Sequence, residues 1–392
     1  MSYISHISAR IVDIPTVRPH KFSFGTISQL SCVIVRLETS DGAVGWGEAT
    51  TIGGASWNEE SPESIFHAIH HYLIPALLDR CVHSIEAALT LMDQRCKGNY
   101  FAKSAIEQAM IDASARLRNM PAHQLLGGAV RSTLPVAWTL ASGNVLRDVE
   151  EAQQALAAKL HRTFKLKIGA RAPGADVDHV RAISKALNGQ ANLIVDINQA
   201  WDTNTALRFI PDLINAGVTL IEQPVERWNT HGLQQASRLA GRAMIMADES
   251  VCTSHDAFAL ASQQACQVYS LKIAKHGGLL RTKQVASIAR AAGIAWYGGT
   301  MLETSLGSAA SLSVFNTIPG EHHGCELFGP RLLVDDIVNA PLKYGNFEVA
   351  LPTDAMHVVG FGVEVNEKQV ERFDRARTGL RPVSVDMGAR AA

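Results

Sequence analysis

The feature that most constrains the fold is a repeat in residues 134–330, where short β-rich runs alternate with Ala- and Leu-rich segments. The runs recur roughly every 25 to 30 residues, a spacing typical of strands joined by helices. We expect strands at residues 136–140, 164–168, 193–197, 219–221, 244–246, 268–273, 294–297 and 325–328, with helices between them, for example at 149–160 and 175–187. Eight such repeats favour a (β/α) barrel over an open sheet.

The region before this repeat has a different pattern. Residues 4–48 read as short strands with a hairpin at Asp41-Gly42, and helical stretches follow at 62–78, 84–96 and 102–118. This order predicts a separate α+β unit. We therefore divide the chain into an N-terminal domain (1–132), a barrel (133–330) and a C-terminal segment (331–392) that returns to the first domain.

Composition excludes several classes of function. The chain has 36 Lys and Arg against 37 Asp and Glu, so its net charge of −1 gives no general attraction for nucleic acid or anionic lipid. No uncharged apolar stretch approaches the roughly 18 residues of a membrane-spanning helix, and the N-terminus does not resemble a secretory signal. The six cysteines lie far apart, which is typical of reduced thiols. We expect a cytoplasmic protein without nucleic-acid or membrane partners.

Ionisable residues stand at the carboxyl ends of the expected strands, where the functional groups of barrels lie. In chain order they are Lys165 and Lys167, Asp196, Glu222, Asp248, Lys272 and Glu303. Any one of them alone could be a solvated strand end. Their recurrence on six consecutive strands indicates an active site at one mouth of the barrel.

Asp196, Glu222 and Asp248 come from three adjacent strands, so their carboxylates should meet and repel one another unless a cation neutralises them. An all-oxygen ligand set without His or Cys selects a hard divalent ion, Mg²⁺ or Mn²⁺. Ion pairs with neighbouring lysines can coexist with this metal site but would neutralise the cluster only in part.

Lysines flank the expected metal site on both sides. Lys165 and Lys167 are two residues apart on one strand and should face the interior together, each lowering the pKa of the other. One of them could then act as a base near neutral pH. Lys272, alone at the end of its own strand, should face them across the barrel. A base beside a metal-bound carboxylate suits the movement of a proton α to that carboxylate.

These strand-end motifs resemble those of the enolase superfamily, in its muconate-lactonising branch, and the resemblance extends over almost the whole chain. A further set of segments resembles the muconate cycloisomerase family in particular: residues 18–21, 49–54, 101–104, 138–143, 298–303 and 326–330. The resemblance implies a (β/α)7β modified TIM barrel with an α+β capping domain formed by the N-terminal region and the C-terminal tail. It also implies a homo-oligomer, an octamer in that family.

The resemblance implies reversible lactonisation of a small dicarboxylate, cis,cis-muconate, to muconolactone through an enediolate. In this scheme Asp196, Glu222 and Asp248 hold Mn²⁺ or Mg²⁺. Lys167 delivers the proton, Lys165 tunes the pKa of Lys167, and Lys272 contributes positive charge. Glu303 would hydrogen-bond or protonate the carboxyl group at the metal. The expected substrate-binding residues are Ile52, Trp57, Asn198 and Phe328, and loops 18–26 and 50–58 should close over the substrate.

Two positions depart from the pattern expected for this family: Trp57 replaces a tyrosine, and Thr304 follows Glu303 in place of a glycine. Both leave chlorinated or methylated muconates open as substrates, whereas Phe328 favours unsubstituted muconate. An N-acylamino-acid racemase or an o-succinylbenzoate synthase is the alternative within the superfamily, because both use the same pair of lysines. A catalytically silent barrel would lack a base or a metal ligand, and none is missing.

Overall fold

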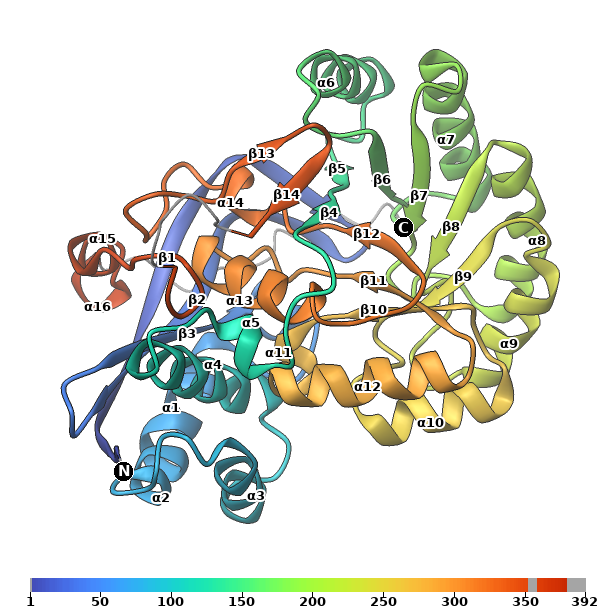
Figure 1. Ribbon diagram of the computed structural model, residues 1–392. Coiled ribbons are helices and arrows are strands. Elements are labelled where there is room, and N and C mark those ends of the chain that lie inside the picture. The colour runs from blue at the N-terminus through green and yellow to red at the C-terminus, as the bar shows by residue number, and fades with distance from the viewer. Residues whose placement is uncertain (1, 352–357, 379–392) are drawn as a thin grey trace.

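The computed structural model describes residues 2–351 and 358–378. Its centre is an eight-stranded sheet in which all neighbouring strands are parallel and follow one another in sequence order (Figure 1). The strands are β5 (Trp138–Leu140), β6 (Thr163–Lys167), β7 (Asn192–Asp196), β8 (Val218–Glu222), β9 (Met244–Ala247), β10 (Val268–Leu271), β11 (Ala295–Gly298) and β12 (His322–Cys325). A parallel bridge between Val136 and Cys325 joins the two edges, so the sheet closes into a barrel.

Seven helical connections link the eight strands and surround the barrel. They are α6 (Val145–Ala157), α7 (Pro173–Leu187), α8 (Thr203–Asn215), α9 (Thr230–Leu239), α10 (Ser254–Gln263), α12 (Leu279–Ala291), preceded by the short α11 (Ile273–His276), and α13 (Ser305–Phe315). Helix α8 is an example of an amphipathic helix: Ala206, Ile210 and Leu213 form its buried stripe, and its polar residues lie outside that stripe. The predicted (β/α)7β barrel is confirmed.

Helix α13 differs from the other connections because every residue in it is buried. It contacts strand β3 of the N-terminal domain, so it is covered on the side where the other barrel helices face solvent. Its residues are uncharged, and most are small or apolar, which fits this enclosed position. Helix α13 therefore joins the two domains.

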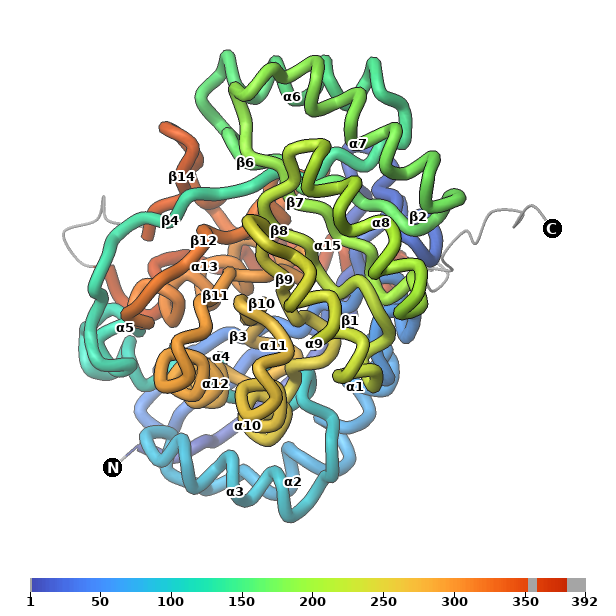
Figure 2. The backbone as a smooth tube through the Cα atoms, turned by 90° about the vertical axis from the view of Figure 1, so that its right-hand side faces the viewer, coloured from blue at the N-terminus to red at the C-terminus, as the bar shows by residue number. Residues whose placement is uncertain are grey.

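The N-terminal domain is an antiparallel sheet covered by helices. Its strands are β1 (Ile4–Phe22), β2 (Gly25–Thr39) and β3 (Val44–Thr51), and β2 and β3 form the hairpin predicted at Asp41-Gly42. The helical elements are η1 (Gly54–Ser56), α1 (Pro62–Ala68), η2 (Ile69–Leu73), α2 (Ile74–Leu77), α3 (Ile85–Arg95), α4 (Tyr100–Leu117) and α5 (Ala122–Leu125). This domain lies against one side of the barrel (Figures 1 and 2). We call it the cap.

The described part of the C-terminal segment returns to the cap. Strand β13 (Tyr344–Gly345) pairs with β14 (Glu348–Ala350), and β14 pairs with β4 (Thr133–Pro135). The helices are α14 (Gly329–Leu332), α15 (Glu367–Arg372) and α16 (Arg375–Thr378). Near its end Arg375 pairs with Asp13 of β1 at 2.6 Å. Residues 352–357 and 379–392 of the predicted segment lie outside the described residues. The two boundaries between the three predicted segments stay predictions.

The predicted eighth strand is displaced. We expected residues 325–328, but β12 spans His322–Cys325, and Phe328 precedes α14 with φ −100° and ψ 0°. The apolar run Leu327-Phe328 reads as strand, whereas the polar His322-His323 pair does not. Pairing with the neighbouring strand overrides both local preferences. None of the described helices is long and apolar enough to cross a membrane.

Strand β3 packs so closely on α4 that a side chain added at Gly47 of β3 should destabilise the cap. A Cβ atom at Gly47 would lie 2.0 Å from the carbonyl oxygen of Ala105 and 2.9 Å from the nitrogen of Ala109. Gly47→Ala should therefore lower the free energy of unfolding by about 3 kcal/mol, since backbone must move. Gly345→Ala, with nothing within 4 Å of its Cβ, is the control. Urea unfolding measures both, and equal losses would contradict the packing described.

Candidate active site

The parallel register of β6, β7 and β8 aligns the polar residues at the strand ends. Lys167 is the register partner of Asp196, and Asp196 is the partner of Glu222. Asp248 follows β9 directly, next to β8 in the sheet. The three carboxylates are 1%, 0% and 1% exposed, so they form one buried acidic row at the barrel mouth.

A lysine pairs with each end of this row. Lys167 Nζ lies 2.5 Å from Asp196 Oδ2, and Lys272 Nζ lies 2.6 Å from Asp248 Oδ2. Lys167 ends β6 and Lys272 follows β10, four strands further round the sheet. The two ammonium groups therefore approach the acidic row from opposite sides of the barrel.

The middle carboxylate, that of Glu222, has a buried oxygen without a hydrogen-bond partner. Burial, and then the charge of Asp196, raise the pKa of Glu222 well above its ordinary value. Its Oε2 lies 2.5 Å from Lys165 Nζ, but its buried Oε1 has no hydrogen-bond partner. Burial also tends to raise the pKa of Asp248. The charges of Lys272 and Lys275 outweigh this effect, and the pKa of Asp248 is lowered below its ordinary value.

Glu326 was not among the expected site residues. It follows β12, and its Oε2 lies 2.5 Å from Lys165 Nζ. Burial disfavours the charged amine, but Glu222 and Glu326 together raise the pKa of Lys165 well above its ordinary value. The expectation that its pKa is lowered by Lys167 is wrong for Lys165, because two carboxylates lie closer. Glu326 stands at a strand end only in the observed β12, because the predicted strand 325–328 placed it inside the strand.

Lys275 was also missed. Its Nζ donates to Asp248 Oδ1 and to the backbone oxygen of Asp248, both at 2.7 Å. The prediction that Lys272 stands alone at its strand end is wrong. Helix α11 begins directly after Lys272 and brings Lys275 to the same carboxylate. The three-residue spacing of the two lysines, one helical turn, was the available signal.

Asn198 lies among these groups. Its backbone adopts a φ of +44°, and its Oδ1 accepts a hydrogen bond from Lys167 Nζ at 3.2 Å. Its Nδ2 donates to Glu249 Oε1 at 3.3 Å. The other oxygen of Glu249 is buried without a hydrogen-bond partner. Asn198 thus links the Lys167 side of the site to a further buried carboxylate.

Aromatic rings from the cap cover both lysines. The ring of Phe22 lies 4.9 Å from Lys167 Nζ, and the ring of Trp57 lies 4.4 Å from Lys272 Nζ. Both rings are buried, as is Ile52, which follows β3. Such cation–π contacts favour the charged amine and exclude water. The structure thus places Trp57 at the site and adds Phe22, which sequence reasoning did not select.

The two remaining candidates lie nearby on the barrel. Phe328 is buried against Trp138, with ring centres 5.0 Å apart. Glu303 is buried, and burial raises its pKa. Its carboxylate accepts hydrogen bonds from Thr300 Oγ1 and, at 3.0 Å, from the backbone nitrogen of Met301. Among the described contacts Glu303 is thus bonded within its own loop, whereas Glu326 reaches the acidic row through Lys165.

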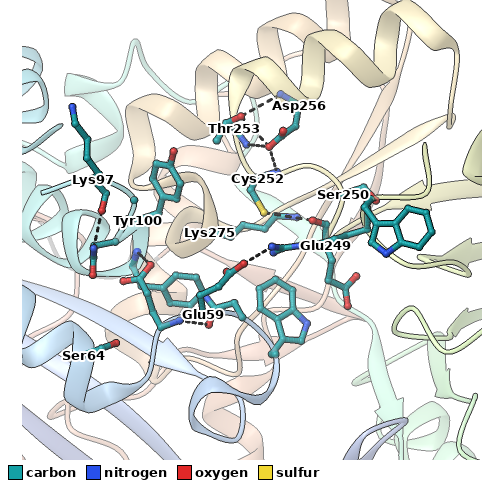
Figure 3. Close-up of a pocket in the computed structure, with 18 residues that line it drawn as sticks. Glu59, Ser64, Lys97, Tyr100, Glu249, Ser250, Cys252, Thr253, Asp256 and Lys275 are labelled. Atoms are coloured by element: carbon teal, nitrogen blue, oxygen red, sulfur yellow. Dashed lines mark hydrogen bonds and ion pairs between the residues drawn. The ribbon is translucent and has the colours of Figure 1, made fainter. Parts of the chain in front are cut away.

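A cavity of about 660 Å³ opens beside the site, between cap and barrel (Figure 3). Glu59, Ser64 and Tyr100 line it from the cap, and Glu249 and Lys275 line it from the barrel. Trp57 also lines this cavity, so its ring separates the cavity from Lys272. A second cavity, of about 910 Å³, reaches Lys167 and Asn198 from the side of residues 21–26.

The acidic row could bind a cation, but its carboxylates are not arranged as a preformed metal site among the described residues. No group of three or more His, Cys, Asp or Glu side chains in the described ranges is arranged to hold a metal ion. Each of the three carboxylates is paired with a lysine. The buried, unpartnered Glu222 Oε1 between two further carboxylates is the observation that fits a bound cation. Oxygen donors alone suit a hard divalent ion.

Comparison with known proteins agrees with this architecture. Residues 6–127 match the family model described as "Mandelate racemase / muconate lactonizing enzyme, N-terminal domain", and residues 147–369 match "Enolase C-terminal domain-like". Together they span both domains of the fold. The two family matches show that this chain, a capped barrel with lysines on both sides of three carboxylates, is an enolase-superfamily enzyme.

Curated relatives and solved structures narrow the family. The chain is 46% identical to muconate cycloisomerase 1 of Pseudomonas putida, covering 95% of this chain and 98% of the relative. It is 43% identical to a chloromuconate cycloisomerase of Cupriavidus necator, covering 95% and 99%. The structure of muconate lactonizing enzyme from Pseudomonas fluorescens, complexed with muconolactone, matches with a TM-score of 0.93 and 45% identity, covering 95% and 100%. The chain belongs to the muconate cycloisomerase family.

The contacts of the two glutamates predict unequal effects on turnover. Glu326→Gln removes a buried charge beside Lys165 and should lower kcat by about 100-fold, the typical cost of losing one well-placed polar group in an active site. Glu303→Gln alters hydrogen bonds within its own loop and a weaker electrostatic interaction with Lys272, and it should lower kcat less. Steady-state kinetics at matched folded fractions, checked by circular dichroism, test this. A larger loss in Glu303→Gln would place that carboxylate in the site.

Proposed function

We propose that this chain is a muconate cycloisomerase that converts cis,cis-muconate reversibly to muconolactone. The observation that carries the proposal is the buried acidic row with Lys167 on one side and Lys272 on the other. The relatives named muconate cycloisomerase, which match over nearly their whole length, support it. The substrate is a small dicarboxylate.

The reaction needs one bond-forming step and one proton. An oxygen of one substrate carboxylate adds to a carbon of the diene, and the displaced electron pair is delocalised into the other carboxylate as an enediolate. A proton is then added to the α-carbon, so the dianion gains one proton and becomes the lactone monoanion. We assign that proton to Lys167, and to Lys272 the role of a positive charge on the opposite face. Lys165 orients and neutralises carboxylates beside Lys167.

Muconate cycloisomerases of the enolase superfamily use a divalent metal ion. We propose that Asp196, Glu222 and Asp248 hold it here and that it is Mn²⁺ or Mg²⁺, since all donors are oxygens. When bound, the ion supplies positive charge that stabilises the enediolate. Binding requires the lysines to give up part of their contact with these carboxylates.

We further propose that Ile52, Trp57, Asn198 and Phe328 surround the substrate. Trp57 and Phe328 supply the buried aromatic walls, and Asn198 supplies a polar group next to Lys167. Glu326, or the expected Glu303, would hydrogen-bond the carboxyl group that does not form the lactone. The chain is also expected to form a homo-oligomer, an octamer by resemblance to its family.

A chlorinated muconate is the second candidate substrate. Chloromuconate cycloisomerases match at 43% identity over 95% of the chain, close to the value for the muconate enzymes. A substituted diene would have to fit between the same aromatic walls. Comparing kcat/KM for muconate and for chloromuconate decides between them, and we expect the ratio to favour muconate.

The reaction in heavy water tests the function and the two lysine roles together. With cis,cis-muconate and Mn²⁺, the diene absorbance should disappear, and the lactone should carry a single deuterium at its α-carbon, on one face. Only one new C–H bond forms, so one lysine carries the proton.

The matched variants are Lys167→Ala and Lys272→Ala. The first should abolish both turnover and labelling, whereas the second should slow turnover but leave the labelled face unchanged. Deuterium on both faces of the α-carbon in the wild type would indicate a two-base site and favour the racemase alternative. An unchanged diene spectrum would contradict the proposed function itself.

A further inference from the structure

One buried carboxylate of the cap, Glu48, binds the barrel next to the active site. Glu48 lies in β3 and is 2% exposed, and it forms no ion pair among the described residues. Its carboxylate accepts hydrogen bonds from Thr304 N at 2.9 Å, Thr304 Oγ1 at 2.6 Å and Gly307 N at 2.9 Å. Three donors from one short segment of the barrel thus converge on this one side chain.

Glu48 is itself held firmly by the cap. Gln108 of α4 forms two hydrogen bonds with the backbone of Glu48, accepting from its nitrogen at 3.1 Å and donating to its oxygen at 2.7 Å. Thr50 Oγ1 donates to the carboxylate at 2.5 Å. Burial raises the pKa of Glu48 to about 7 although the hydrogen bonds from Thr304 and Thr50 lower it. The cap therefore presents a fixed acceptor to the barrel.

The segment that Glu48 holds, residues 299–304, separates two parts of the active site. At its start, a Cβ atom on Gly299 would lie 2.7 Å from Lys272 Cε, so its backbone touches the stem of that lysine. At its other end, a Cβ atom on Gly329 would lie 2.1 Å from the backbone oxygen of Glu303. The segment thus lies between Lys272 and the Phe328-Gly329 turn, in contact with both sides.

The same segment is strained. Leu302 has a φ of +68°, a left-handed conformation that is unfavourable for a residue with a Cβ atom. Such a conformation persists only where the surroundings hold it. The hydrogen bonds of Glu48 to Thr304 and Gly307 fix the chain within a few residues of Leu302.

We propose that Glu48 is a positioning residue: it sets the place of residues 299–304, and through them the placement of the Lys272 side chain and the Phe328 wall. The cap then contributes to the active site through this buried contact as well as through the aromatic rings of its loops. This inference deepens the proposed function and rests on it for its kinetic readout.

Glu107 provides a matched control. It also belongs to the cap, is fully buried, and has a pKa raised to about 7 by burial. Its carboxylate also accepts from backbone nitrogens at the start of a barrel helix, Leu279 and Leu280 of α12. None of its described hydrogen bonds involves residues 299–304. Glu107→Gln therefore removes a comparable carboxylate without releasing that segment.

The experiment compares Glu48→Gln, Glu48→Ala and Glu107→Gln by kinetics. In the Glu48 variants kcat should fall at least about tenfold, more for alanine than for glutamine, with a small change in KM, because displacement of a reacting group by about 1 Å can cost far more. Glu107→Gln should lose comparable thermal stability and keep kcat near the wild-type value. Equal effects on kcat in the Glu48 and Glu107 variants would overturn the proposal.

Hydrogen–deuterium exchange gives a readout that does not depend on muconate turnover. Residues 299–304 should exchange faster in Glu48→Gln, and the start of α12 should exchange faster in Glu107→Gln. If Glu48→Gln fails to fold, Thr304→Val removes the hydroxyl donor to Glu48, together with the hydrogen bond that Thr304 Oγ1 accepts from Leu306 N at the start of α13. It leaves the cap unchanged and should also speed exchange at residues 299–304. Unchanged exchange there would overturn the inference, whereas inactivity of the wild type would contradict only the proposed function.

Discussion

Repulsion among three buried carboxylates is the constraint on which the rest of the site depends. Parallel pairing places Asp196 beside Glu222, and Asp248 follows on the next strand. In a medium of low dielectric these charges could not coexist unpaired. Lys165, Lys167, Lys272 and Lys275 supply the opposite charge. In the proposed function the same lysines act on the substrate, and the three carboxylates would hold the divalent ion.

The cap covers the active-site lysines and contributes side chains to the site. Phe22 and Trp57 cover the two facing lysines, and Glu48 fixes the loop that packs against Lys272. The barrel alone would leave the ammonium groups open to water, where electrostatic interactions are weak. A chemistry that depends on charge therefore needs both domains, and they meet at the fully buried helix α13.

The sequence was sufficient for the barrel and for the groups at its strand ends, because strand spacing and parallel register follow from local pattern. The same reasoning missed Glu326, whose strand was displaced by three residues, and Lys275, which reaches Asp248 only because a helical turn begins at Ile273. It also predicted the wrong direction for the pKa of Lys165. That direction depends on which charges lie nearest in three dimensions, and pairing across the barrel is not visible in local sequence.

Binding of Mn²⁺ to metal-free protein tests the central claim most directly. The electron paramagnetic resonance signal of free Mn²⁺ disappears on binding, so a titration gives stoichiometry and affinity without any substrate. We predict one ion per chain in the wild type, with the dissociation constant raised at least about tenfold in Asp248→Asn and in Glu222→Gln, since each removes a charged oxygen ligand. Wild-type protein that binds no Mn²⁺, or variants that bind it equally well, would contradict the assignment of the acidic row.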